Sequence, residues 1–156
     1  MSKINGIYAA SVSILDENLK LDIHKTIRHA ENLIKSGCHG VVIFGSTGQS
    51  QLISLEEKFE LIQNISKSLF KDKFIIGTGL NSLQDTISLI KISNSYNFNN
   101  FLIMPPAYYM YEDKDVIRFY IKLIEKLSNC KIILYNFEKL SGYKFSKESV
   151  ETVSYT

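Results

Sequence analysis

The chain has 156 residues, of which 45% are hydrophobic and 22% are charged, and its formal net charge is +2. This length is sufficient for one domain with a buried core, but it is too short for a standard eight-unit α/β barrel. The near-neutral charge shows no basic run or stripe, which argues against nucleic-acid binding. No apolar run approaches the roughly 18 residues of a membrane span. The first ten residues, MSKINGIYAA, contain no apolar signal segment, so we expect a cytoplasmic protein without a membrane segment.

Cysteine and histidine residues show no spacing that is typical of a metal site. Cys38 and Cys130 are isolated, and neither a CxxC nor a mixed Cys/His motif is present. His24 and His29 lie five residues apart on one expected helix, so they do not share a helix face as a metal-binding pair would. We therefore expect no metal and no cofactor.

Short apolar segments alternate with amphipathic segments along the whole chain. The apolar segments predict five strands, at residues 4–13, 41–44, 74–76, 101–104 and 131–135. Four polar residues of types that cap helices each precede a segment with helical spacing: Asp22, Ser54, Ser82 and Ser146. A further helix is expected after the tyrosine-rich loop 107–111, and loops are expected at 94–100 and 136–143. Five strand–helix pairs in succession predict parallel strands with helices packed outside them.

Residues 40–50, GVVIFGSTGQS, are the most informative stretch. A buried strand ends there in Gly45-Ser46-Thr47-Gly48, where the two glycines allow a sharp turn. Ser54 and Glu57 then form a capping box that starts the next helix. Free main-chain amides and hydroxyls between a strand and a helix suit a carboxylate or a phosphate. A glycine-rich turn without a ligand is the alternative interpretation of this stretch.

The pattern allows two arrangements of a single domain that covers residues 1–156. One is an open, doubly wound sheet, and the other is part of a (β/α)8 barrel. In both of them ligands bind at the C-terminal ends of the strands. The hydroxyl-bearing candidates at those ends are Thr47, Thr78, Tyr108, Tyr109 and Tyr135.

Five stretches, in this order, resemble the dihydrodipicolinate synthase and N-acetylneuraminate lyase family of pyruvate-dependent aldolases. They are GSTG at 45–48, GTGLN at 77–81, PAYY at 106–109, YN at 135–136 and SG at 141–142. The resemblance covers nearly the whole chain. It implies a (β/α)8 TIM barrel, here truncated to about the first five β/α units, and an imine between pyruvate and a lysine on the sixth strand.

The resemblance also implies roles for particular residues. Ser46, Thr47 and Gly48 would bind the carboxylate of pyruvate or of another 2-oxo acid, while an aldehyde is the second substrate. Tyr135 would shuttle protons beside the imine. Tyr108 would complete a relay from Thr47 through Tyr135 by reaching into a neighbouring subunit, so a homo-oligomer, a dimer or a tetramer, is expected. The activity would be that of a 4-hydroxy-tetrahydrodipicolinate synthase, an N-acetylneuraminate lyase or a 2-keto-3-deoxy sugar acid aldolase.

The sequence departs from the family pattern at several positions. Gln49 replaces a glutamate that is common after GSTG, and Glu138 replaces a proline after the YN motif. Leu140 stands where dihydrodipicolinate synthases usually carry an arginine that binds their dicarboxylic partner. The sequence therefore does not predict which aldehyde is the second substrate. The strand with the imine lysine is absent, and we expect the chain alone to be inactive. A non-catalytic anion-binding or oligomerisation module is the alternative function.

Overall fold

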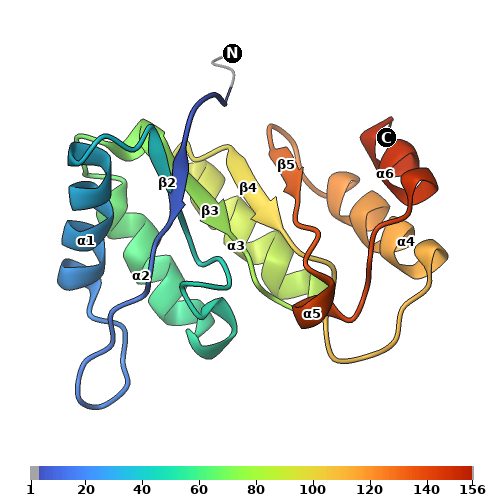
Figure 1. Ribbon diagram of the computed structural model, residues 1–156, viewed down its shortest axis with the longest axis horizontal. Coiled ribbons are helices and arrows are strands. Elements are labelled where there is room, and N and C mark those ends of the chain that lie inside the picture. The colour runs from blue at the N-terminus through green and yellow to red at the C-terminus, as the bar shows by residue number, and fades with distance from the viewer. Residues whose placement is uncertain (1–3, 156) are drawn as a thin grey trace.

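The computed structural model of the chain describes residues 4–155, nearly all of the expected domain 1–156. Its centre is a five-stranded parallel sheet in which the strands follow chain order, β1-β2-β3-β4-β5 (Figure 1). The strands are β1 (Tyr8–Ala10), β2 (Gly40–Ile43), β3 (Phe74–Gly77), β4 (Asn100–Ile103) and β5 (Lys131–Leu134). A doubly wound sheet reverses its strand order, so this uninterrupted order corresponds to an arc of a (β/α)8 barrel, as expected.

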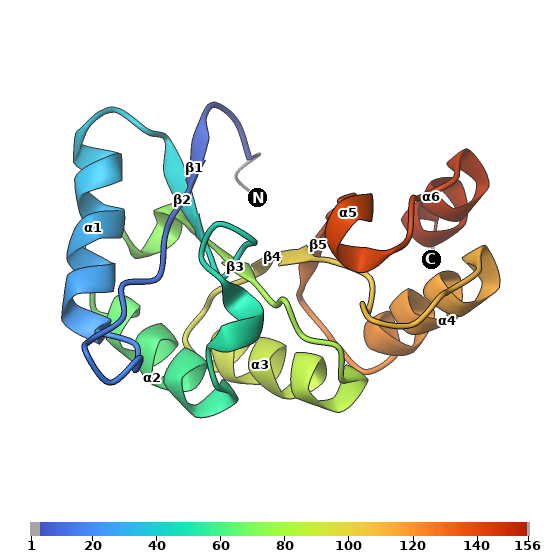
Figure 2. The same cartoon turned by 60° about the horizontal axis from the view of Figure 1, so that its bottom comes forward.

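The helices follow one another round one side of this sheet, and Figure 2 shows α1 to α4 in that order. The helices are α1 (Ile23–Lys35), α2 (Leu55–Ile65), α3 (Leu83–Ser95), α4 (Asp113–Ile124), α5 (Glu138–Ser141) and α6 (Lys147–Ser154). Each of the four predicted caps is confirmed, because its side chain accepts a hydrogen bond from a backbone N–H three residues later. The capping box of Ser54 and Glu57 is also present.

Four elements differ from the prediction. The first strand is limited to Tyr8–Ala10 because its partner strand begins only at Gly40, opposite Tyr8. The short helix α5 lies within the expected loop 136–143, and residues 94 and 95 still belong to α3. The apolar spacing after Ser54 predicts a second helix whose apolar face extends to Leu69, but α2 ends at Ile65 and Leu69 is 99% exposed.

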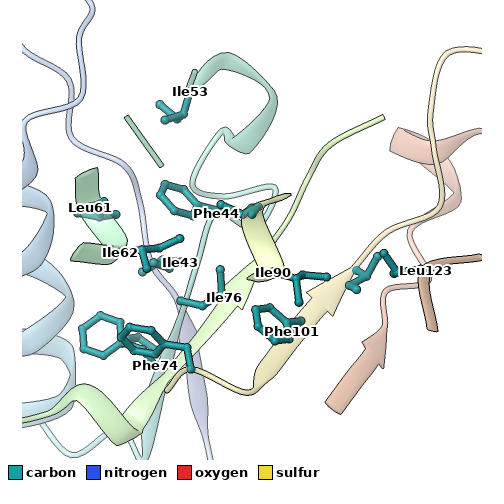
Figure 3. Packing of buried hydrophobic residues seen from close by; sticks show 14 of the residues in the cluster. Ile43, Phe44, Ile53, Leu61, Ile62, Phe74, Ile76, Ile90, Phe101 and Leu123 are labelled. Carbon is teal, nitrogen blue, oxygen red and sulfur yellow. The ribbon is translucent and has the colours of Figure 1, made fainter. Parts of the chain in front are cut away.

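The hydrophobic core lies between the sheet and the helices (Figure 3). Alternate strand residues point toward it, and those of the central strands are fully or almost fully buried: Val41, Ile43, Phe74, Ile76, Phe101 and Ile103. They share one cluster with helix residues such as Leu61, Ile62, Ile90 and Leu123. This packing fixes the strands, and therefore the loops that leave their C-terminal ends.

The intervening strand residues form a second apolar row, here called the inner row, on the opposite face of the sheet. It consists of Val42, Ile75, Leu102 and Ile133, in which Val42 pairs with Ile75 and Leu102 with Ile133. Three of these four residues are only partly buried. Strands that are apolar on both faces are typical of a parallel barrel, whose interior is filled by side chains.

Candidate active site at the C-terminal ends of the strands

Two segments that are distant in the sequence meet at the C-terminal edge of the sheet. Ser46 lies in the loop that follows β2, and Tyr135 comes directly after β5. Their hydroxyl oxygens are 2.7 Å apart and share a hydrogen bond in which either group can be the donor. The backbone N–H of Tyr135 donates to the carbonyl of Ile103 at 2.9 Å, which fixes the tyrosine against β4.

The loop of Ser46 is held in place by side chains from two other segments. The Ser13 hydroxyl donates to the Gly48 carbonyl at 2.6 Å, and the buried Ser50 hydroxyl donates to the Thr78 carbonyl at 3.1 Å. Gly48 is itself buried, and a Cβ atom there would lie 2.9 Å from the carbonyl oxygen of Ser11. The loop is therefore tied to the strand ends on both sides, and it presents a fixed backbone.

Three successive backbone N–H groups of this loop, those of Ser46, Thr47 and Gly48, donate to no acceptor within residues 4–155. The next two N–H groups close the turn, because Gln49 donates to the Ser46 carbonyl and Ser50 to the Gly45 carbonyl. Free main-chain donors beside a hydroxyl form a favourable site for an anion such as a carboxylate.

A cavity of about 250 Å³ opens beside the Ser46–Tyr135 pair. Its lining is mainly apolar and carries no charged side chain: Phe44, Gly45, Ser46, Gln49, Ser50, Gln51, Leu52, Gly79, Leu102, Met104, Tyr135 and Leu140. No group of three or more His, Cys, Asp or Glu residues in the described part of the chain could hold a metal ion. None of its helices is long and apolar enough to cross a membrane.

The structure brings together some of the predicted site residues and separates others. Ser46 contacts Tyr135, whereas we expected Thr47 to do so. The Thr47 side chain is exposed and has no hydrogen bond within residues 4–155, because neighbouring residues in the turn point in different directions. In this structure the hydroxyl beside Tyr135 is therefore that of Ser46.

Tyr108 lies apart from this pair. Its side chain is 88% exposed, and its contact is an edge-on packing against Tyr109 with ring centroids 5.0 Å apart. Its backbone has a φ of +83°, which is rare for a residue with a bulky side chain. Backbone strain of this kind is concentrated at functional sites. The geometry leaves the ring free to reach another molecule.

Two lining positions, Leu102 and Leu140, were not predicted as site residues, and the sequence contains a signal for the first of them. Leu102 alternates with the buried Phe101 and Ile103, so it must face the inside of the arc. Leu140, which is 48% exposed, projects into the cavity from α5. Its position depends on α5, and a helix of four residues is too short to be recognised from the periodicity of the sequence.

Comparison with known proteins identifies relatives in sequence and in fold. A 4-hydroxy-tetrahydrodipicolinate synthase of Thermosipho africanus is 31% identical over 96% of this chain and 50% of its own length. An N-acetylneuraminate lyase of Escherichia coli is 25% identical over 97% of this chain and 52% of its own length. A variant of the Sulfolobus solfataricus 2-keto-3-deoxygluconate aldolase, solved as a pyruvate complex, has a TM-score of 0.86. It is 25% identical and covers 96% of this chain and 50% of that one.

The chain thus spans about half the length of the curated relatives that it matches. The model of the dihydrodipicolinate synthetase family matches residues 3–155, which is almost the entire chain. The chain belongs to the dihydrodipicolinate synthetase family.

Proposed function

We propose that this chain forms the first five units of a pyruvate-dependent aldolase that works through an imine. The observation that carries the proposal is the 2.7 Å contact between Ser46 and Tyr135 beside three free backbone N–H groups. This arrangement offers an anion site and a proton-transferring phenol at one point. The pyruvate complex of the Sulfolobus aldolase supports pyruvate as the first substrate.

The residues of the loop would bind the substrate carboxylate. The N–H groups of Ser46, Thr47 and Gly48 can each donate to a carboxylate oxygen, and the fixed loop requires no reorganisation for this. The 2-oxo carbon would then lie beside the Tyr135 hydroxyl. Carboxylate binding is thus assigned mainly to the backbone, so the exposed Thr47 side chain is not required for it.

Tyr135 would move the proton in the reaction. An imine makes the adjacent methyl group of pyruvate acidic, and loss of one proton gives a nucleophile that attacks the aldehyde carbon. The Tyr135 phenol shares a hydrogen bond with the Ser46 hydroxyl, so a proton can pass between these two oxygens, which are 2.7 Å apart. The imine requires an amine, and the cavity lining contains no lysine, so the amine would come from a unit beyond these five.

The lining also restricts the second substrate. Leu52, Leu102, Met104 and Leu140 present apolar surface, and no charged side chain of the described residues lines the cavity. A second carboxylate would have no counter-ion on this side, and leaving a charge unpaired in such a place is costly. We therefore propose that the part of the aldehyde that contacts this cavity carries no carboxylate. A cytosolic location stays a prediction.

The second candidate function is an oligomerisation module. Tyr108, Tyr109 and Met110 are 88%, 66% and 91% exposed, and three adjacent large apolar side chains on one loop favour contact with another subunit. This contact is compatible with the aldolase proposal, since the expected oligomer would use the same loop. It becomes the main function only if the site proves inactive in a complete barrel.

The proposal is tested in a complete barrel in which the last units of a related aldolase follow residue 156. We compare Tyr135→Phe with Tyr143→Phe, whose phenol donates to Asp113 at 2.7 Å and does not line the cavity. Tyr135→Phe should lower kcat by about 10²- to 10⁴-fold with little change in KM for pyruvate. Tyr143→Phe should retain kcat. Equal turnover of the two variants would remove Tyr135 from the mechanism.

A further inference from the structure

Lys58, on α2, has a fully buried side chain. Its ammonium group has no hydrogen-bond partner within residues 4–155. The carboxylates of Glu57 and of Asp85 on α3 act on it through space, but neither of them forms an ion pair with it in that part of the chain. Lysine is almost never fully buried without a partner, because an unpaired buried charge is costly. This placement therefore calls for a physical reason.

The ammonium group of Lys58 does contact an aromatic ring. Its Nζ atom lies 5.7 Å from the centroid of the Phe44 ring, within the range of a cation–π interaction. Phe44 is only 2% exposed, so water is excluded from the contact. Cation–π interactions are strongest when both groups are desolvated.

Phe44 is the residue at which the chain turns from β2 into the site loop. Its φ is +55°, in the left-handed region that bulky side chains rarely adopt. The turn brings the Phe44 carbonyl against β3, where a Cβ atom on Gly77 would lie 2.4 Å from that oxygen. Ser46 follows two residues later. A strained backbone of this kind persists only where its surroundings hold it.

We propose that Lys58 is a positioning residue for the site. Its ammonium group holds the Phe44 ring in the core, and the ring holds the left-handed turn that carries Ser46 to Tyr135. The burial of a charge without a hydrogen bond is then the cost of fixing this loop. The inference concerns the shape of residues 44–49 and does not depend on pyruvate, so its failure and that of the aldolase proposal can be distinguished.

If Lys58 positions the loop in this way, the loop should respond to loss of the proton from Lys58. Burial lowers the pKa of the Lys58 ammonium from 10.5 to about 8, although Asp85 and then Glu57 act in the opposite direction. A neutral amine has no cation–π attraction to the ring. A local opening of the loop that leaves Lys58 buried loses this attraction without hydrating the ammonium group, so such opening should become more frequent above this pKa. Global unfolding, which hydrates Lys58, should not become more frequent.

The test is hydrogen–deuterium exchange of the chain, measured by mass spectrometry at low concentration and corrected for the intrinsic effect of pH. The N–H groups of Gln49 and Ser50, which donate to the Ser46 and Gly45 carbonyls and close the turn, should lose about tenfold of their protection between about pH 7 and about pH 9.5. This is the size expected from loss of a desolvated cation–π contact. Lys58→Met keeps a long apolar side chain but has no charge. It should show the lower protection at both pH values.

Two further variants complete the design. Lys71→Met removes a cation that lies 5.9 Å from the Phe98 ring, away from the loop. It should leave the protection of Gln49 and Ser50 as in the wild type. Phe44→Leu should abolish the pH effect, so the proposal can be tested even if Lys58→Met fails to fold. Protection of the Gln49 and Ser50 N–H groups that is independent of pH in the wild type would overturn the proposal. Equal protection in Lys58→Met and the wild type at about pH 7 would do the same.

Discussion

Replacing Lys58 by methionine should raise the free energy of unfolding at neutral pH. The pKa of Lys58 is lowered from 10.5 to about 8 by burial, and each pKa unit corresponds to about 1.4 kcal/mol. Burial of the cation therefore destabilises the fold by about 3 kcal/mol at pH values below both pKa values. The contact with Phe44, for which the exchange experiment expects a tenfold effect, offsets about 1.4 kcal/mol of this. A methionine fills the same space without a charge, so Lys58→Met should gain about 2 kcal/mol.

The difference in the free energy of unfolding between Lys58→Met and the wild type should depend on pH. Between about pH 8 and pH 10.5 the unfolded chain holds a proton on Lys58 that the folded chain has released. The free energy of unfolding of the wild type therefore rises with pH across this window, and that of Lys58→Met lacks this rise. The advantage of the variant should shrink as pH rises from about 8 to 10.5.

Denaturant titrations followed by far-UV circular dichroism measure this difference, since the chain has no tryptophan. Lys71→Met serves as the control at a lysine that is not fully buried. A Lys58→Met variant that is less stable than the wild type at neutral pH would refute the reasoning. A stability gain that stays constant with pH would also refute it. Together with the exchange experiment, the account predicts opposite effects: a more stable fold with a looser site loop.

Three other predictions concern the packing of the arc. Tyr120→Phe should cost about 1 kcal/mol in thermal or chemical unfolding, because the buried phenol donates to the Ile103 carbonyl at 2.8 Å. Asp113→Ala should loosen α6, since this carboxylate accepts hydrogen bonds from Tyr143 and Ser146, and limited proteolysis should then cut beyond residue 142 faster than in the wild type. The chain alone should self-associate and bind a hydrophobic dye. Three of the four inner-row side chains are only partly buried, and the outer edges of β1 and β5 have no partner strand within residues 4–155. Sedimentation would show this, whereas a sharp monomer that binds no dye would contradict it.

Much of the fold could be predicted from the sequence because local signals agreed with each other. The caps at Asp22, Ser54, Ser82 and Ser146 begin their helices as expected. The short apolar strands lie within a residue or two of their predicted positions, apart from β1. The uninterrupted strand order required the structure, because alternation alone allowed both a barrel arc and a doubly wound sheet.

The site was harder to predict because it depends on directions of side chains. The loop GSTG was found, but sequence could not show that Ser46 rather than Thr47 turns toward Tyr135. Lys58 was missed although its spacing contains a signal. It lies three to four residues before the buried Leu61 and Ile62, so helical periodicity places it on the inward face of α2. A charged residue on an apolar stripe is easily taken for a surface residue when only the apolar members are counted.

The most direct test of the aldolase account is to trap the imine. The chain, and a complete barrel in which the last units of a related aldolase follow residue 156, are incubated with pyruvate and reduced with borohydride, and their intact masses are measured. The account predicts no stoichiometric adduct on the chain alone, because no lysine lines the cavity beside Ser46 and Tyr135. It predicts one adduct per complete barrel. A single adduct on one lysine of the chain alone, or none on a folded complete barrel, would contradict it.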